Sequence, residues 1–192
     1  ERAWQRDGFH NLHACCAGPS AGARHLKANL MICLGNPMMG DDGAGWHIFR
    51  HLVQSAALPR DWEIRFGGTD LFSFASDMEG RRLVVVVDAV ESPQPPGSLE
   101  LLEVDQIPVE GLSRGAHQFS AVESVRLLQM TVDGLADVRF VLLAVAMASV
   151  RVGPNLSPEL SSRLPRIVDK LILLVLEQTR SRALHAPGEA VG

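Results

Sequence analysis

The chain has 192 residues, of which 46% are hydrophobic and 21% are charged, values typical of one globular domain with a full core. The net charge of −4 disfavours binding to nucleic acid, and no apolar run reaches the ~18 residues that a transmembrane helix needs. The sequence shows no signal-peptide pattern, which favours the cytoplasm, and its three cysteines do not predict a disulfide framework.

Composition divides the chain into three segments. Residues 1–27 have no sustained hydrophobic period and include the linker-like AGPSAGA, which predicts a flexible leader. Two histidines and two cysteines in this leader could bind a metal, but the second ligand pair of a zinc site is absent, so a disordered leader is favoured. Residues 28–178 are expected to form a single α/β domain, and residues 179–192 a disordered tail.

The pattern over residues 29–57 predicts a strand, a tight loop and a helix. The apolar run Leu30–Leu34 is short and ends at Gly35, as expected for a buried strand. The loop GNPMMGDDGAG follows, and a helical period begins after it. The apolar stripe of this helix consists of Phe49, Leu52, Val53, Ala56 and Ala57.

Two adjacent acids, Asp41 and Asp42, stand at the start of this helix. The helix macrodipole favours acids there, but two acids between glycines at the mouth of a buried strand suggest a functional site. His47 and His51 have the spacing of a zinc-binding HxxxH, yet Ile48 replaces the Glu of a metalloprotease HExxH. We therefore expect both histidines on the solvent-exposed face of the helix, opposite the apolar stripe.

The next two strands are also predicted by local patterns. Residues 62–66 alternate between apolar and charged side chains, which predicts a half-buried strand that ends at GGT, residues 67–69. A short helix follows, and then Leu83–Val87 is continuous and β-branched, as in a parallel strand buried on both faces. Asp88 comes at the carboxyl end of this strand, where ligands bind in open α/β sheets, so a functional role is favoured over a loop cap.

The second half of the chain continues the alternation of strands and helices. A strand over Leu99–Val104 follows a PPG turn without an intervening helix, so one strand of the sheet is expected to run antiparallel. A Ser-x-x-Glu capping box at residue 120 opens a helix, and His117 stands just before it. A strand at Arg139–Met147 and a final helix from Pro158 complete the domain.

This order predicts a three-layer α/β/α sandwich with a twisted, mostly parallel but mixed central sheet of about five strands. Asp42, Asp88 and His117 each follow a strand or precede a helix, and such positions converge on one edge of the sheet in this architecture. Two carboxylates and one imidazole suit a borderline divalent ion such as Ni²⁺ or Zn²⁺, and they leave coordination positions open for a substrate. Without a metal, the same groups could form an acid–base pair.

Four separated motifs resemble those of the [NiFe]-hydrogenase maturation endopeptidases, especially the members that serve formate-hydrogenlyase-type hydrogenases. They are LGNPMMGDDGAG, GGT at residues 67–69, VVVDA around Asp88, and the AHQ that contains His117. The resemblance covers about residues 29–178. It implies a peptidase that removes the C-terminal peptide from a hydrogenase large-subunit precursor after nickel insertion. The nickel bound in that substrate would be the recognition element, and either a metal ion or a carboxylate could activate the attacking water.

The resemblance also implies which residues act. The family's nickel-binding and catalytic trio corresponds to Asp42, Asp88 and His117, and some members have Glu in the place of Asp42. The loop around the trio would be supported by neighbouring polar and glycine residues, which are Gly35, Asn36, Asp41, Gly43, Gly68 and Thr69. Nickel is expected only as a transient, substrate-borne ion, with no tightly bound cofactor. The partner would be the precursor alone, without membrane or nucleic acid, and the protein is expected to be a monomer.

The chain departs from the family pattern at two places. It reads LAVAM where many relatives have Gly-x-x-Pro after the strand near Leu143, and Cys33 stands where many have a glycine. One alternative function is a nickel-checking chaperone with the same ligands and no hydrolysis. The other is a Rossmann-like nucleotide-binding module, although the loop fits neither GxGxxG nor a P-loop, and its acids would repel phosphate.

Overall fold

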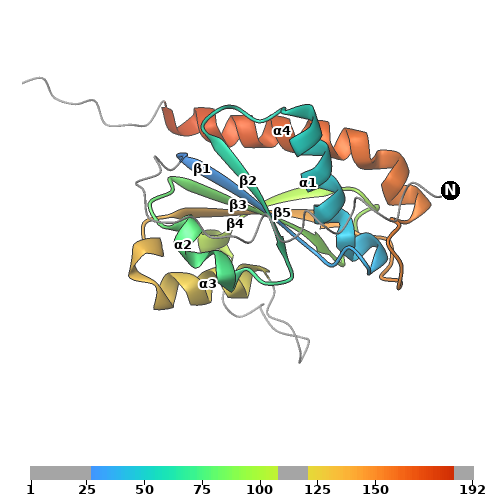
Figure 1. The fold of residues 1–192 in the computed structure, drawn as a ribbon, viewed down its shortest axis with the longest axis horizontal. Coiled ribbons are helices and arrows are strands. Elements are labelled where there is room, and N and C mark those ends of the chain that lie inside the picture. Colours follow the sequence, from blue (N-terminus) through green and yellow to red (C-terminus); the bar gives the residue numbers. More distant parts are fainter. Residues whose placement is uncertain (1–26, 108–120, 184–192) are drawn as a thin grey trace, which may run out of the picture.

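The computed structural model describes residues 27–107 and 121–183, which form a five-stranded sheet between helices (Figure 1). The strands are β1 (Asn29–Leu34), β2 (Trp62–Gly68), β3 (Leu83–Val90), β4 (Leu99–Glu103) and β5 (Arg139–Ala146). They lie in the order β2-β1-β3-β5-β4, and all neighbours pair in parallel except β4, which runs antiparallel to β5. The predicted mixed, mostly parallel sheet is confirmed.

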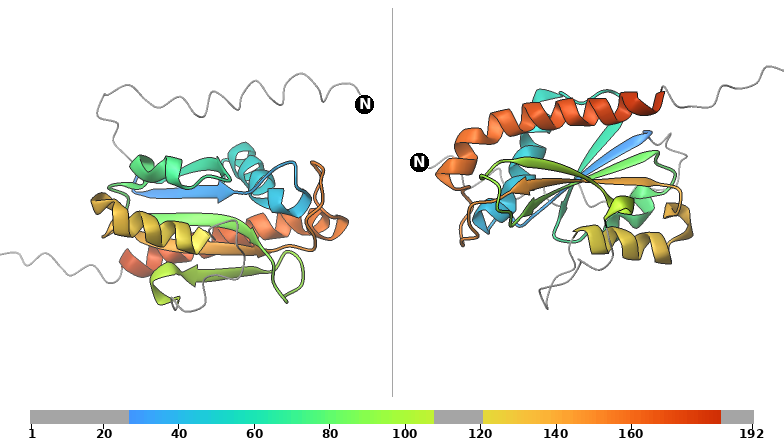
Figure 2. Two further views of the ribbon diagram at one scale, coloured as in Figure 1. Left: turned by 90° about the horizontal axis from the view of Figure 1, so that it is seen from below. Right: turned by 180° about the vertical axis from the view of Figure 1, so that it is seen from behind.

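Helices cover both faces of this sheet (Figure 1, Figure 2). The helices α1 (Ala44–Ser55) and α4 (Pro158–Ala183) lie on one face, and α2 (Ala75–Met78) and α3 (Ala121–Thr131) lie on the other. Short 3-10 turns join several of these elements, and they are η1 (Gly40–Gly43), η2 (Phe72–Phe74), η3 (Val104–Gln106) and η5 (Asp133–Leu135). No helix in the described part of the chain combines the length and apolarity that crossing a membrane requires.

Apart from Asn29 and Asp88, the central strands β1 and β3 are apolar, because both of their faces are covered. Successive side chains of a strand point to opposite faces. Odd-numbered residues such as Cys33 and Val85 therefore pack with α1 and α4, while even-numbered residues such as Ile32 and Val84 pack with α2 and α3. This double burial fixes the two strands, and their carboxyl ends bring the loop after β1 next to the end of β3.

The predicted apolar stripe of the first helix is right at Leu52, which is buried, and at Phe49, which packs against the core, but it is wrong at Val53, Ala56 and Ala57. The buried side of α1 contains Ile48 and Leu52, whereas Val53 is 52% exposed and Ala56 lies outside the helix as a left-handed C-cap. The phase is set at the start of α1, where Gly45 lies so close to β1 that a Cβ on it would be 1.9 Å from a backbone oxygen. This contact turns Ile48, and not Val53, toward the sheet.

Other expectations from the sequence have mixed outcomes. An antiparallel strand is present, but the two strands joined by the PPG turn are not neighbours, because β5 lies between β3 and β4. A short helical segment follows β2, and the carboxylate of Asp70 accepts the amide of its first residue, Phe72, at 3.0 Å. The expected disordered tail begins too early, because residues 179–183 continue α4. Residues 1–26 of the leader and residues 184–192 lie outside the described residues, so flexibility there stays a prediction.

Candidate functional site

The loop between β1 and α1 closes tightly on itself, and its glycines make this possible. Gly35 has a φ of +129°, and a Cβ on it would lie 2.0 Å from the carbonyl oxygen of Asp42. The Gly35 amide donates to the carbonyl of Gly68 at 2.7 Å, which ties the loop to the end of β2. Asn36 then donates its backbone amide to a carboxylate oxygen of Asp42 at 2.9 Å. Its side-chain oxygen accepts the Met38 amide at 3.0 Å.

The structure brings Asp42 and Asp88 together, as the sequence predicted. Asp42 lies in η1 at the carboxyl end of β1, and Asp88 lies near the end of the adjacent strand β3, with both side chains half-buried. Burial, followed by the negative charge of Asp42, raises the pKa of Asp88 to about 6, although the Ala89 amide donates to Asp88 at 2.9 Å and acts in the opposite direction. A half-buried carboxyl group with a raised pKa, close to a second carboxylate, is suited to holding a proton or, together with its neighbour, a cation.

The third predicted member of the site, His117, lies outside the described residues, so its place beside the two aspartates stays a prediction. Within residues 27–107 and 121–183, no group of three or more His, Cys, Asp or Glu side chains could hold a metal ion. The described part of the site therefore supplies a pair of carboxylates.

Asp41 has a different role from its neighbour Asp42. Only 1% of Asp41 is exposed. Its carboxylate accepts hydrogen bonds from the amides of Ala148 (3.0 Å), Ser149 (3.3 Å) and Ser157 (2.7 Å) and from the Ser157 hydroxyl (2.9 Å). Burial by itself raises the pKa of Asp41, but these hydrogen bonds outweigh burial and lower it below its usual value. Asp41 thus joins the loop after β1 to the segment between β5 and α4.

A second link holds the same two segments together through the backbone. The Gly40 amide donates to the Gly153 carbonyl at 2.9 Å, and the Gly153 amide donates to the Met38 carbonyl at 2.8 Å. Sequence reasoning did not identify residues 148–157 as part of the site. Ser157 was recognisable as a helix start, and its hydroxyl does accept the Leu160 amide at 3.2 Å, but no local pattern pointed to Asp41.

The remaining predicted support residues lie around this loop. Gly43 is buried against the backbone of Asn36, and a Cβ on it would lie 3.0 Å from the Asn36 carbonyl oxygen. Gly68 ends β2 in a left-handed conformation with a φ of +58°, and the exposed Thr69 follows it. Gly67 is the extra residue of a bulge, because Cys33 pairs with Phe66 and the next residue of β1 pairs with Gly68.

The prediction for the two helix histidines is right for one and wrong for the other. His51 is exposed, as expected. His47 is half-buried, and its Nε2 atom is buried without a hydrogen-bond partner among the described residues. Burial lowers the pKa of His47, although a hydrogen bond to the backbone of Pro154 acts in the opposite direction. The helix buries Ile48, next to His47, and not Val53. His47 therefore lies toward the segment between β5 and α4, where it bonds to the backbone of Pro154.

A pocket of about 360 Å³ lies over the edge of the sheet formed by β4 and β5, and neither Asp42 nor Asp88 is among its described lining residues. Register places Ala144 between Asp88 on β3 and Glu100 on β4. The pocket is lined by alanines of the LAVAM stretch and by mostly polar neighbours, namely Val90, Ser92, Gln94, Ser98, Leu99, Glu100, Ala144, Ala146 and Lys170. Small side chains at the departure from the family pattern thus leave space on the strand next to β3, where Ala144 is the register partner of Asp88.

Comparisons with known proteins identify the family of this chain. The model of the HycI hydrogenase maturation protease family matches residues 46–174. Protein FrxA of Pyrococcus furiosus is 28% identical over 141 residues, which cover 72% of this chain and 98% of that protein. The Hydrogenase 2 maturation protease of Escherichia coli is 25% identical over 164 residues, which cover 84% of this chain and 97% of that protein.

Solved structures show the same fold. The [NiFe] hydrogenase maturation protease HybD from Thermococcus kodakarensis superimposes with a TM-score of 0.60 at 26% identity, covering 76% of this chain and 97% of the other. The hydrogenase maturating endopeptidase HybD of E. coli has a TM-score of 0.63 at 20% identity, covering 78% and 93%. Because the family model matches well over half of the sequence, this chain belongs to the hydrogenase maturation protease family and is a peptidase.

Proposed function

We propose that this peptidase removes the C-terminal extension of a [NiFe]-hydrogenase large-subunit precursor after nickel insertion, and that it recognises the nickel carried by that substrate. The observation that supports this proposal most directly is the Asp42–Asp88 pair. Burial and, second to it, the negative charge of Asp42 raise the pKa of Asp88, and a cation between the two carboxylates would favour the charged form of Asp88.

The donor set fits an ion that arrives with the substrate. Carboxylate oxygens are adequate but not preferred ligands for nickel, and two of them leave most coordination positions open for ligands of the precursor. Weak, transient binding follows from this small number of donors. His117 is proposed as the third ligand, which would add the nitrogen donor that nickel favours.

Asp88 is proposed as the group that takes a proton from the attacking water. A general base works best when its pKa is near the operating pH, and the value of about 6 for Asp88 is much closer to neutrality than that of an ordinary aspartate. Asp42 would contribute negative charge and orientation, since the Asn36 amide holds its carboxylate. The pocket on β4 and β5, one strand away from Asp88, would give the peptide on one side of the scissile bond space and polar groups.

Membership of a peptidase family disfavours both the nickel-checking chaperone and the nucleotide-binding module. A monomer acting in the cytoplasm remains our expectation, because nothing in the composition indicates a membrane or a secreted, disulfide-bonded protein.

The decisive test is to mix this protein with a nickel-loaded hydrogenase precursor and to follow the mass of the precursor. We expect the loss of a C-terminal peptide, and we expect the nickel-free precursor to stay intact. The Asp88→Asn variant, which keeps the shape of the side chain, should not cleave. Full cleavage by Asp88→Asn or by Asp42→Asn would overturn the assignment of these residues, and an intact nickel-loaded precursor with wild-type protein would overturn the function.

A further inference from the structure

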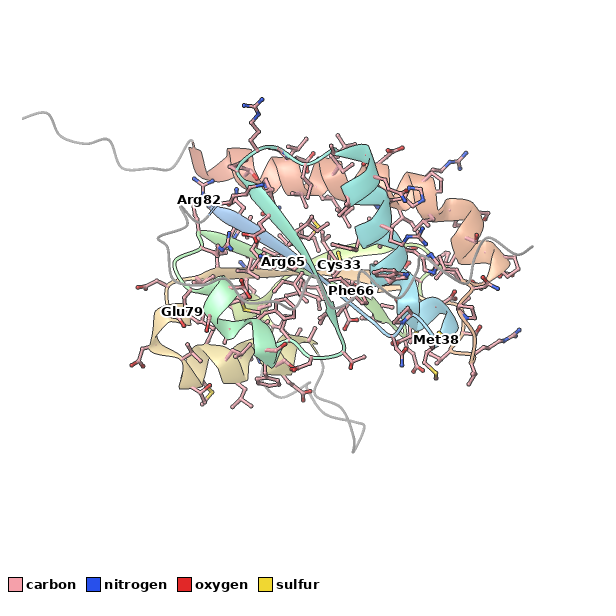
Figure 3. All side chains as sticks on the ribbon, in the orientation of Figure 1. Cys33, Met38, Arg65, Phe66, Glu79 and Arg82 are labelled. Atoms are coloured by element: carbon pink, nitrogen blue, oxygen red, sulfur yellow. The ribbon has the colours of Figure 1, made fainter. Side chains whose placement is uncertain are left out.

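An exposed apolar surface lies on the two loops that frame the carboxylate pair. It consists of Met38, Val150 and Val152, which are 50%, 45% and 88% exposed, and we name these three residues the apolar rim. Met38 belongs to the loop between β1 and α1, where it lies at the periphery of the molecule (Figure 3). The two valines belong to the segment between β5 and α4. Large apolar side chains exposed together beside a site commonly mark a binding surface.

The loops that present the apolar rim are firmly held. The Gly153 amide and carbonyl bond to the backbone of Met38 and Gly40 at 2.8 and 2.9 Å. The buried carboxylate of Asp41 bonds the same segment at both ends, at Ala148 and at Ser157. Exposure of Val150 and Val152 is therefore not the result of a loose loop, because the backbone that carries them is fixed on both sides.

The apolar rim lies on the side of the molecule from which a substrate would reach the carboxylate pair. Met38 and Asp42 both belong to the segment between β1 and α1. The two valines follow β5, the strand that pairs with β3 at Asp88. A polypeptide that brings a metal to Asp42 and Asp88 approaches from the carboxyl ends of these strands. The hydrogen bonds of Asp41 and Gly153 hold the two rim loops together at the loop that carries Asp42, so a folded body around that metal would face the apolar rim.

We propose that the apolar rim docks an apolar patch on the folded body of the precursor, next to its nickel centre. This inference rests on the proposed function and extends it, because it assigns recognition of the folded substrate to residues outside the carboxylate pair. The rim would mainly hold the substrate and would not take part in bond cleavage. Its loss should therefore change KM more than kcat.

The test compares charged substitutions at the rim with matched substitutions elsewhere. Val150→Asp and Val152→Asp place a charge where an apolar contact is expected. Val53→Asp on α1 is a control of the same residue type, and Met130→Asp on α3 is a control of similar exposure, at 84% against 88% for Val152. Cleavage of the nickel-loaded precursor is followed at increasing precursor concentration, and urea unfolding checks that every variant is folded.

We expect KM to rise about tenfold or more in the two rim variants, with kcat nearly unchanged and with both controls close to wild type. Wild-type cleavage together with an unchanged KM in both rim variants would overturn the docking surface alone. A wild-type protein that forms dimers, which Val152→Asp separates, would identify a second copy of the chain as the occupant and would also overturn it. Failure of the wild type to cleave would overturn the proposed function itself.

Discussion

Replacing Asp41 by asparagine tests whether this buried acid holds the site together. One carboxylate oxygen accepts the Ser157 amide, and the other accepts the Ala148 amide, the Ser149 amide and the Ser157 hydroxyl. Asparagine has only one acceptor oxygen. In its better orientation it keeps the three bonds, and its NH₂ group then faces the Ser157 amide, so a buried donor loses its acceptor.

The expected cost follows from these bonds. An unsatisfied buried donor costs about 1–3 kcal/mol, and the three bonds that remain lose the strengthening that comes from a charged acceptor. Easier burial of the neutral amide offsets part of this loss. We expect the free energy of unfolding of Asp41→Asn to fall by about 2–4 kcal/mol at pH 7. Urea unfolding, read as a shift of the midpoint at unchanged slope, measures this difference.

The pH dependence has a definite sign. Because the pKa of Asp41 lies below its ordinary value of 3.8 in the folded state, its stabilisation is complete above that value and is lost as the pH falls through the lower folded pKa. The gap between wild type and Asp41→Asn should therefore be full at pH 7 and shrink below pH ~4. Asp42→Asn is the matched control, since Asp42 is half-buried, and we expect a loss below ~1.5 kcal/mol. Equal stability of wild type and Asp41→Asn at pH 7 would refute the role of Asp41.

Two further predictions concern stability. The raised folded pKa of Asp88 means that wild type loses stability as the pH rises from about 4 to about 6, by up to ~3 kcal/mol. Metal-free Asp88→Asn should lose this slope and unfold at higher urea than wild type at pH 7, although we expect it not to cleave. A pH slope equal to that of wild type would contradict this prediction. Gly45→Ala should lose at least about 2–3 kcal/mol, because its Cβ would lie 1.9 Å from the Leu34 carbonyl oxygen. Gly68→Ala, with a φ of +58° and no atom within 4 Å, should cost only about 1 kcal/mol in the same urea assay.

Local patterns in the sequence were sufficient for the elements and for the carboxylate pair. The run Leu83–Val87 identifies a strand buried on both faces, because only such a strand gains from β-branched apolar residues at every position. Asp88 directly follows that run, and Asp42 follows another strand, so parallel pairing of β1 and β3 was enough to bring both acids to one edge. These features depend on neighbours close in the chain and on one general rule of α/β sheets.

Tertiary structure decided the features that depend on contacts between distant residues. Asp41 and Asp42 are alike in sequence, yet the partners of Asp41 lie 107 to 116 residues away, so only the folded chain separates the buried link from the site carboxylate. The phase of α1 likewise depends on the contact of Gly45 with β1, which buries Ile48 and leaves Val53 exposed. Hydrophobic periodicity gives the possible faces of a helix, but packing against a particular strand selects one of them.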